Sequence, residues 1–321
     1  MTLPLPPAVD IREVGPRDGL QGEAPVAPEG RARLVEALLD AGIRRIEAVS
    51  FVSPTAVPAM AQPQAVLSAI PRHPETTIGA LVPNLRGAVR ALEAGVDELT
   101  VTIAASPEYN RRNVHMSIDE SVQAIADICA RSSEAGVPVD AVVSCAFGSP
   151  YEGDIPAREV AELAARLRRA GAQALTLADT TGMATPRVLS EVLAATGTDI
   201  GLHLHDTRGT ALLNAYAAME LGVSRFDTSV GGLGGSPFAE SAAGNLATED
   251  FVALLDDLQV RTGVSLDRLL AAGALAEQLV GHPLPGHVSR VGSRLAGGGG
   301  GSPPASAGAA SPRPTAPPVD E

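Results

Sequence analysis

Apolar and polar positions follow a repeating pattern along most of the chain. Short apolar runs, typical of buried parallel strands, are each followed by a segment with helical spacing. The expected strands cover residues 9–14, 44–50, 76–82, 98–104, 139–144, 174–179, 200–205 and 225–230. The expected helices cover about 28–41, 56–70, 84–94, 117–135, 155–170, 186–196, 208–221 and 248–260, with a further helix over 265–280. The pattern therefore predicts eight strand–helix units and a short helical extension.

Glycines stand at the ends of several predicted helices, where a left-handed residue commonly closes the last turn. The triplets AGI, AGV, AGA and LGV recur at these points. Eight such units in about 250 residues predict an α/β protein with a (β/α)₈ TIM barrel. A doubly wound sheet is the alternative. It would need a glycine-rich phosphate turn after an early strand, and EVGPRDGLQG does not have the form G-x-G-x-x-G.

The composition changes abruptly near residue 296. The segment that follows is rich in Gly, Pro, Ser and Ala and nearly free of large apolar residues. Such a segment cannot bury enough apolar surface to fold, so we expect a disordered tail. The predicted organisation is one TIM-barrel catalytic domain over 1–295 and a disordered tail over 296–321.

Composition and charge exclude several classes of protein. Hydrophobic residues make up 45% of the chain, which suffices for a core, and the formal net charge is −13. An acidic chain disfavours nucleic-acid binding, and an anionic substrate would need a local basic group. Two cysteines make no disulfide framework, no apolar run reaches ~18 residues, and the first residues lack a signal sequence. We therefore expect a cytoplasmic enzyme with no membrane partner.

Polar side chains are expected at the carboxyl ends of the strands, where barrel enzymes carry their active sites. The residues that the pattern places there are Arg17, Asp18, Gln21, Glu47, Asp179, Thr180, His203, His205, Asp206 and, after the last strand, Asn245.

The segment HLHD places two histidines two positions apart. On a strand, His203 and His205 would project from the same face, an arrangement that suits a divalent metal. The alternative is a pair of hydrogen-bonded histidines near the barrel mouth. Only one strand separates the first and seventh strands in a closed barrel, so Asp18 can approach the same point. Mg²⁺ or Mn²⁺ suits an oxygen-binding role, whereas imidazole also suits Zn²⁺ or Fe²⁺, and the ligands alone do not choose.

Arg17 would place a second fixed cation beside this group. Its guanidinium can hold an oxygen that gains negative charge, as an enolate oxygen does. The alternative is a salt bridge to Glu47, a buried carboxylate that needs a partner. The two interpretations are compatible.

Seven segments in order resemble the motifs of the 3-hydroxy-3-methylglutaryl-CoA lyase family. They are VGPRDGLQ, EAVSFVSP, PNLRGAVRALEAGVDE, VSCAFGSPYEG, ADTTGMATP, HLHDTRG and GGLGGSPFAESAAGNLATED, and the resemblance runs from about residue 9 to 292. The family belongs to a group of metal-dependent aldolase-like barrels that includes isopropylmalate and homocitrate synthases. Those synthases carry an acidic residue where this chain has Leu20.

The resemblance implies a role for each matching residue. Asp18, His203 and His205 match ligands of Mg²⁺ or Mn²⁺, and Asn245 matches a further ligand or near neighbour. Arg17 matches the arginine that stabilises the enolate. The remaining matches are the carboxylates Glu47 and Asp179, substrate contacts at Gln21 and Thr180, and two serines at family cysteine positions, Ser149 and Ser236.

The implied reaction is retro-Claisen cleavage of an acyl-CoA substrate to acetyl-CoA and acetoacetate, as in leucine degradation and ketone-body formation. Asp179 or a histidine would act as the base. A serine hydroxyl is a far weaker acid than a thiol, so Ser236 cannot simply replace the family cysteine. Three outcomes stay open: another group protonates the enolate, the substrate is a related one, or lyase activity is largely lost. We expect a homodimer, as is common in this group.

Three classes of function remain as alternatives. The first is this lyase, or a lyase for another branched 3-hydroxyacyl-CoA. The second is a Claisen-type condensing enzyme of the same barrel group, against which Leu20 and the lack of a regulatory domain argue. The third is a binding protein with a damaged site, which the complete set of metal ligands disfavours.

Overall fold

Eight parallel strands close into a barrel in the computed structural model, which describes residues 5–235, 244–292 and 294. The strands follow one another in sequence order around the barrel, and the last pairs with the first. The strands are β1 (Asp10–Glu13), β2 (Arg45–Ser50), β3 (Thr77–Leu81), β4 (Glu98–Ala104), β5 (Val139–Ser144), β6 (Ala174–Ala178), β7 (Gly201–His203) and β8 (Arg225–Thr228). The predicted (β/α)₈ TIM barrel is confirmed.

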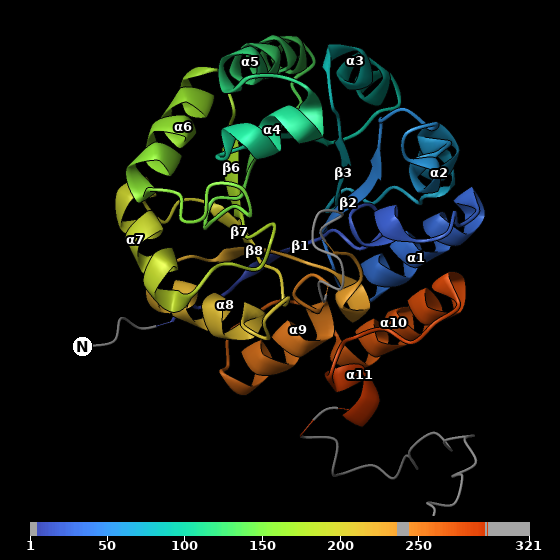
Figure 1. The fold of residues 1–321 in the computed structure, drawn as a ribbon. Coiled ribbons are helices and arrows are strands. Elements are labelled where there is room, and N and C mark those ends of the chain that lie inside the picture. The colour runs from blue at the N-terminus through green and yellow to red at the C-terminus, as the bar shows by residue number, and fades with distance from the viewer. Residues whose placement is uncertain (1–4, 236–243, 293, 295–321) are drawn as a thin grey trace, which may run out of the picture.

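Helices form a ring around the strands (Figure 1). They bury apolar faces against the barrel, as Leu34, Val35 and Leu38 of the first helix illustrate by being fully buried. Removing such faces from water is the main force that holds the ring in place. The ring helices are α1 (Pro28–Asp40), α2 (Pro63–Ala69), α3 (Leu85–Glu93), α5 (Ile118–Glu134), α6 (Ala157–Arg169), α7 (Pro186–Thr196), α8 (Ala211–Glu220) and α9 (Thr248–Asp257).

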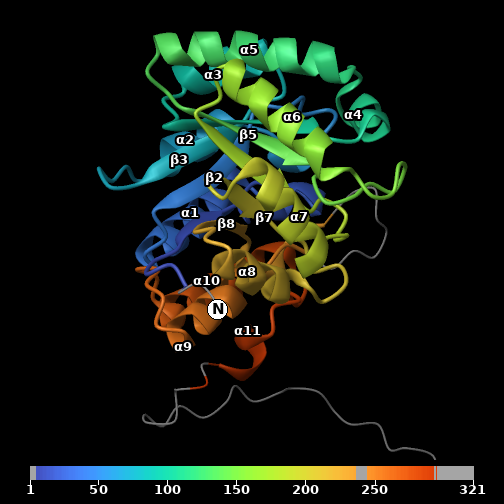
Figure 2. The same ribbon diagram turned by 90° about the vertical axis from the view of Figure 1, so that its left-hand side faces the viewer.

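The predicted helical extension is present and packs against the first and last helices of the ring. Helix α10 (Leu266–Val280) packs against α1, and the short α11 (Val288–Val291) follows it. Figure 2 shows both next to α9, on the side of the barrel opposite α5. The domain boundary near residue 296 stays a prediction, because the tail over 296–321 lies outside the described residues.

The structure differs from the predicted elements at several places. The helix expected over 56–70 is divided into a 3₁₀ turn, η2 (Pro58–Met60), and α2, because a proline suits only the first turn of a helix. Helix α4 (Pro107–Val114) was not predicted, since its sequence PEYNRRNV has little apolar periodicity. It follows β4 directly and lies within the ring of outer helices (Figure 1). Strands β7 and β8 end at His203 and Thr228, each two residues earlier than predicted, and the short α11 was not predicted.

Candidate metal centre and active site

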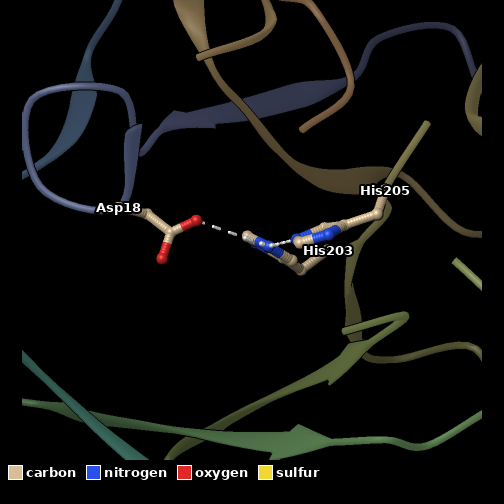
Figure 3. Close-up of side chains that lie close together, drawn as sticks. All are labelled: Asp18, His203 and His205. Carbon is tan, nitrogen blue, oxygen red and sulfur yellow. Dashed lines mark hydrogen bonds and ion pairs between the residues drawn. The ribbon is translucent and has the colours of Figure 1, made fainter. Parts of the chain in front are cut away.

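Three side chains from two distant segments of the chain converge at the carboxyl end of the barrel (Figure 3). Asp18 comes from the turn after β1, and His203 and His205 come from the end of β7 and the residues beyond it. One ligand atom from each lies within 4.8 Å of the others. The Nε2 atoms of the two histidines are 3.1 Å apart, and His203 Nε2 is 3.8 Å from Asp18 Oδ2. The structure therefore brings together three of the four residues for which the sequence predicted a place at the metal, and the fourth, Asn245, lies beside them.

Backbone contacts place each of these residues. The Asp18 amide donates to the carbonyl of Val14 over 2.7 Å, which folds the turn after β1 back over the strand end. His205 lies beyond β7, where it forms an isolated antiparallel bridge with Asn245. The neighbouring Leu204 is buried in the apolar core, so the alternation predicted for a strand continues past the end of β7.

Asn245 completes one side of this group. Its Nδ2 donates to Asp18 Oδ2 and to the carbonyl of Leu233, each over 2.9 Å. Its Oδ1 is buried and has no hydrogen-bond partner within the described part of the chain. An unpaired buried carbonyl oxygen is costly, and a cation would satisfy it. Asn245 thus holds Asp18 in place and leaves an oxygen free to bind.

The donor set fits a divalent cation. Neighbouring ligands at about 2.1 Å from an octahedral ion lie about 3 Å apart, close to the separation of the two imidazole Nε2 atoms. Although burial opposes ionisation, the charge of Arg17 lowers the pKa of Asp18 to about 2, so the ligand is a carboxylate. Burial lowers the pKa of His205 to about 3, which keeps its imidazole neutral. Ionised carboxylate and neutral imidazole are the forms that bind metals.

Arg17 lies between two carboxylates beside this centre. Its Nε donates to Glu47 Oε1, and its Nη1 donates to Asp18 Oδ1 over 2.7 Å. The predicted salt bridge between Arg17 and Glu47 is confirmed. The other oxygen of Glu47 is buried without a partner among the described residues. The pair thus fixes a buried guanidinium at the edge of the metal-binding group.

Asp179 lies at the end of β6, next to β7. Its Oδ1 accepts from the Ala184 amide over 2.9 Å, while its Oδ2 is buried and unpaired within the described residues. Burial raises the pKa of Asp179 to about 6. A carboxylate with one free oxygen and a pKa near neutrality can accept a proton.

The other predicted residues are spread around this centre. The Thr180 hydroxyl accepts from the Cys145 amide over 2.9 Å, and Gln21 is half-buried in the 3₁₀ turn η1 (Gly19–Gly22). Ser149 stands at one of the family cysteine positions. Its hydroxyl donates a hydrogen bond to Glu152 over 2.6 Å, which is a structural contact. Ser236 lies outside the described residues. The roles given to these residues stay predictions.

Sequence reasoning missed two buried charged residues beneath the centre. Asp227 of β8 lies 3.2 Å from His203 Nδ1, and Arg12 of β1 contacts both oxygens of Asp227. Both stand within expected strands, in DIRE and RFDT. A charged residue at an inward position of a barrel strand is the signal that could have identified them.

The family model described as HMGL-like matches residues 8–276. The chain belongs to this family. Hydroxymethylglutaryl-CoA lyase of Mus musculus, named as mitochondrial, is 44% identical over 275 residues, covering 84% of this chain and 85% of that protein. The corresponding lyase of Bacillus subtilis is 41% identical over 289 residues, covering 88% of this chain and 97% of the relative.

Solved structures of HMGL-like proteins superpose closely on this barrel. The Bacillus subtilis HMG-CoA lyase has a TM-score of 0.88 at 40% identity and covers 90% of this chain and 99% of its own. An HMG-CoA lyase of Acinetobacter baumannii, in complex with coenzyme A and 3-methylmalate, has a TM-score of 0.85 at 38% identity, with 90% and 96% covered. The resemblance drawn from the seven sequence motifs is therefore confirmed.

Proposed function

We propose that this protein is a metal-dependent carbon–carbon lyase that cleaves 3-hydroxy-3-methylglutaryl-CoA to acetyl-CoA and acetoacetate. One observation carries the proposal: Asp18, His203 and His205 converge beside the buried Arg17 at the carboxyl end of the barrel. The identity with hydroxymethylglutaryl-CoA lyases over most of both chains supports the same reaction.

The proposed cofactor is Mg²⁺ or Mn²⁺. Asp18, His203, His205 and the free Oδ1 of Asn245 would hold it, and these ligands offer both oxygen and nitrogen. Such an ion, when bound, supplies Lewis-acid polarisation of substrate oxygens. The mixed ligand set leaves the choice between the two metals to measurement.

Asp179 would accept a proton from the substrate, and Arg17 would stabilise the negative charge that develops on it. Asp179 takes the proton of the C3 hydroxyl through its unpaired Oδ2, since a base works best with a pKa near the operating pH. The C2–C3 bond then breaks, acetoacetate leaves, and the electron pair moves onto the thioester as an enolate. The guanidinium of Arg17, held by Glu47, would stabilise that negative oxygen.

The enolate carbon must finally gain a proton to form acetyl-CoA. The resemblance to the lyase family implies a cysteine at this step, at the position where this chain has Ser236. A thiol has a pKa of roughly 8.5, and a serine hydroxyl is a far weaker acid. We therefore assign this proton to a group other than Ser236.

We also propose an acyl-CoA thioester as substrate, a homodimer, a cytoplasmic location, and no nucleic-acid or membrane partner. The coenzyme A in the Acinetobacter baumannii complex supports the thioester. The net charge of −13 argues against nucleic acid. Among the described residues, no helix has the length and apolar character needed to cross a membrane.

Acetyl-CoA release from 3-hydroxy-3-methylglutaryl-CoA tests this proposal. The protein is stripped with EDTA and assayed alone, with Mg²⁺ and with Mn²⁺. We expect release with added metal and little or none without it. Release that EDTA does not affect would contradict the metal requirement. No release with any metal would contradict the substrate, and other branched 3-hydroxyacyl-CoA thioesters would then be assayed.

A further inference from the structure

Three charged or ligating side chains stand in a row across adjacent strands below the candidate metal centre. In the strand register, Arg12 of β1 pairs with Asp227 of β8, and Asp227 pairs with His203 of β7. Residues paired in this way lie at one level of the barrel and project to the same face. The row therefore joins the barrel interior to the metal-binding group.

Hydrogen bonds connect the row from end to end. Arg12 donates from Nε to Asp227 Oδ1 over 2.8 Å and from Nη2 to Oδ2 over 2.7 Å. The same Oδ2 lies 3.2 Å from His203 Nδ1. Arg12 and Asp227 are only 3% and 6% exposed, so water does not compete for these contacts. An ionised carboxylate that accepts two hydrogen bonds from a guanidinium in bidentate fashion has no proton to donate. His203 Nδ1 is therefore the donor in this contact.

We propose that Asp227 is a positioning residue that fixes His203 with its proton on Nδ1 and its Nε2 lone pair directed at the cation. This inference rests on the proposed metal-dependent function. A neutral imidazole has two tautomers, and only one presents an unprotonated nitrogen to the side where Asp18 and His205 lie. A carboxylate that accepts from the other ring nitrogen selects this tautomer and fixes the ring plane.

Arg12 makes this arrangement rigid. Its Nη1 also donates to Asp140 of β5 over 2.7 Å and lies 3.4 Å from Glu98 of β4. The guanidinium is therefore held from three strands and has little freedom to turn. Both carboxylate oxygens of Asp227 accept hydrogen bonds from Arg12, so each of them faces the positive guanidinium. Asp227 thus stays a charged acceptor in the folded protein.

Asp227→Asn and Asp140→Asn form a matched pair of variants. Each removes one buried negative charge that contacts Arg12, but only Asp227 touches His203. Mn²⁺ affinity is measured by calorimetry on metal-stripped protein, with circular dichroism to check folding. We expect Asp227→Asn to weaken Mn²⁺ binding by about 10- to 100-fold, as loss of a carboxylate behind a ligating histidine does. For Asp140→Asn we expect a change of less than about threefold, since it leaves His203 and its carboxylate in place.

The outcomes separate this inference from the proposed function. Equal weakening in both variants, or no weakening in Asp227→Asn, would overturn the role of Asp227 while leaving the metal centre intact. Wild-type protein that binds no Mn²⁺ would overturn both proposals.

A second measurement uses the wild-type protein, so its result does not depend on whether a variant folds. In ¹⁵N NMR spectra of the Mg²⁺-loaded wild-type protein, we expect His203 to carry its proton on Nδ1. A proton on Nε2 would overturn the inference.

Discussion

At the scale of single residues, several carboxylates in this barrel have a pKa that burial raises. Two of them lie beneath the loop after β8, outside the metal centre. Glu13 accepts from the Gly15 and Val230 amides, and Glu249 accepts from the Gly231 amide over 2.9 Å. Burial raises the pKa of both Glu13 and Glu249 to about 7. These carboxylates therefore link the start of the loop to the stability of the fold.

Glu249→Gln should change how stability depends on pH. A carboxyl group whose pKa rises on folding binds more protons folded than unfolded, so stability falls as pH rises from about 4.5 to 7. At pH 8 we expect the variant to be more stable than wild type by about 1–2 kcal/mol, and at pH 4 we expect little difference. Urea unfolding at both pH values measures this. The exposed Glu36→Gln is the control, and equal stability of Glu249→Gln and wild type at pH 8 would contradict the prediction.

The loop after β8 is the element that joins the candidate site to the outside of the barrel. It leaves through the 3₁₀ turn η3 (Val230–Gly232) and returns at Gly244 and Asn245, with 236–243 outside the described residues. The two ends touch: a Cβ on Gly244 would lie 1.6 Å from the carbonyl oxygen of Gly232. Glycine at 244 therefore sets the position of Asn245, which bonds to Asp18.

Gly244→Ala should disturb the site without touching a metal ligand directly. The added methyl group meets backbone, which cannot rotate away, so the strand end that carries Asn245 must move. We expect acetyl-CoA release to fall by about tenfold or more, since small displacements at a site are costly. Gly22→Ala is the matched control, because a Cβ there meets nothing within 4 Å. Equal rates for the two variants would show that the close approach at Gly244 does not matter.

At the scale of the whole molecule, closure of the barrel determines which residues meet in the candidate site. Residues 18 and 203 are far apart in sequence, and they meet because β8 alone separates β1 from β7. The family match over residues 8–276 covers all eight strands and most of the extension. The segment over 296–321 lies beyond that match.

A chain that ends at residue 295 should therefore keep its fold and activity. We expect its melting temperature and its rate of acetyl-CoA release to equal those of the full chain within error, because every residue assigned to the site precedes residue 246. Thermal unfolding and the lyase assay check this. A clear loss of either would show that the tail over 296–321 contributes to the barrel or to the reaction.

The sequence alone determined the fold class, the order of the elements and most of the candidate site. Strands buried on both faces and glycine-capped helices leave a strong repeating pattern, and polar residues at strand ends stand out against it. The period of a strand was enough to predict that His203 and His205 share a face. Closure of the barrel was enough to predict that Asp18, with one strand between, lies near them. Helix α4 was not predicted, because its residues are mostly polar and show little apolar periodicity.

Only the tertiary structure decided which buried charges meet. Arg12, Asp227 and Asp140 come from three strands, and nothing in their local sequences tells which acid faces which base. That pairing depends on strand register and on the side-chain geometry inside the closed barrel, which are set by contacts between distant segments. The same holds for Asn245: its link to Asp18 exists because the loop after β8 folds back across the end of β1, bringing residues 227 positions apart into contact.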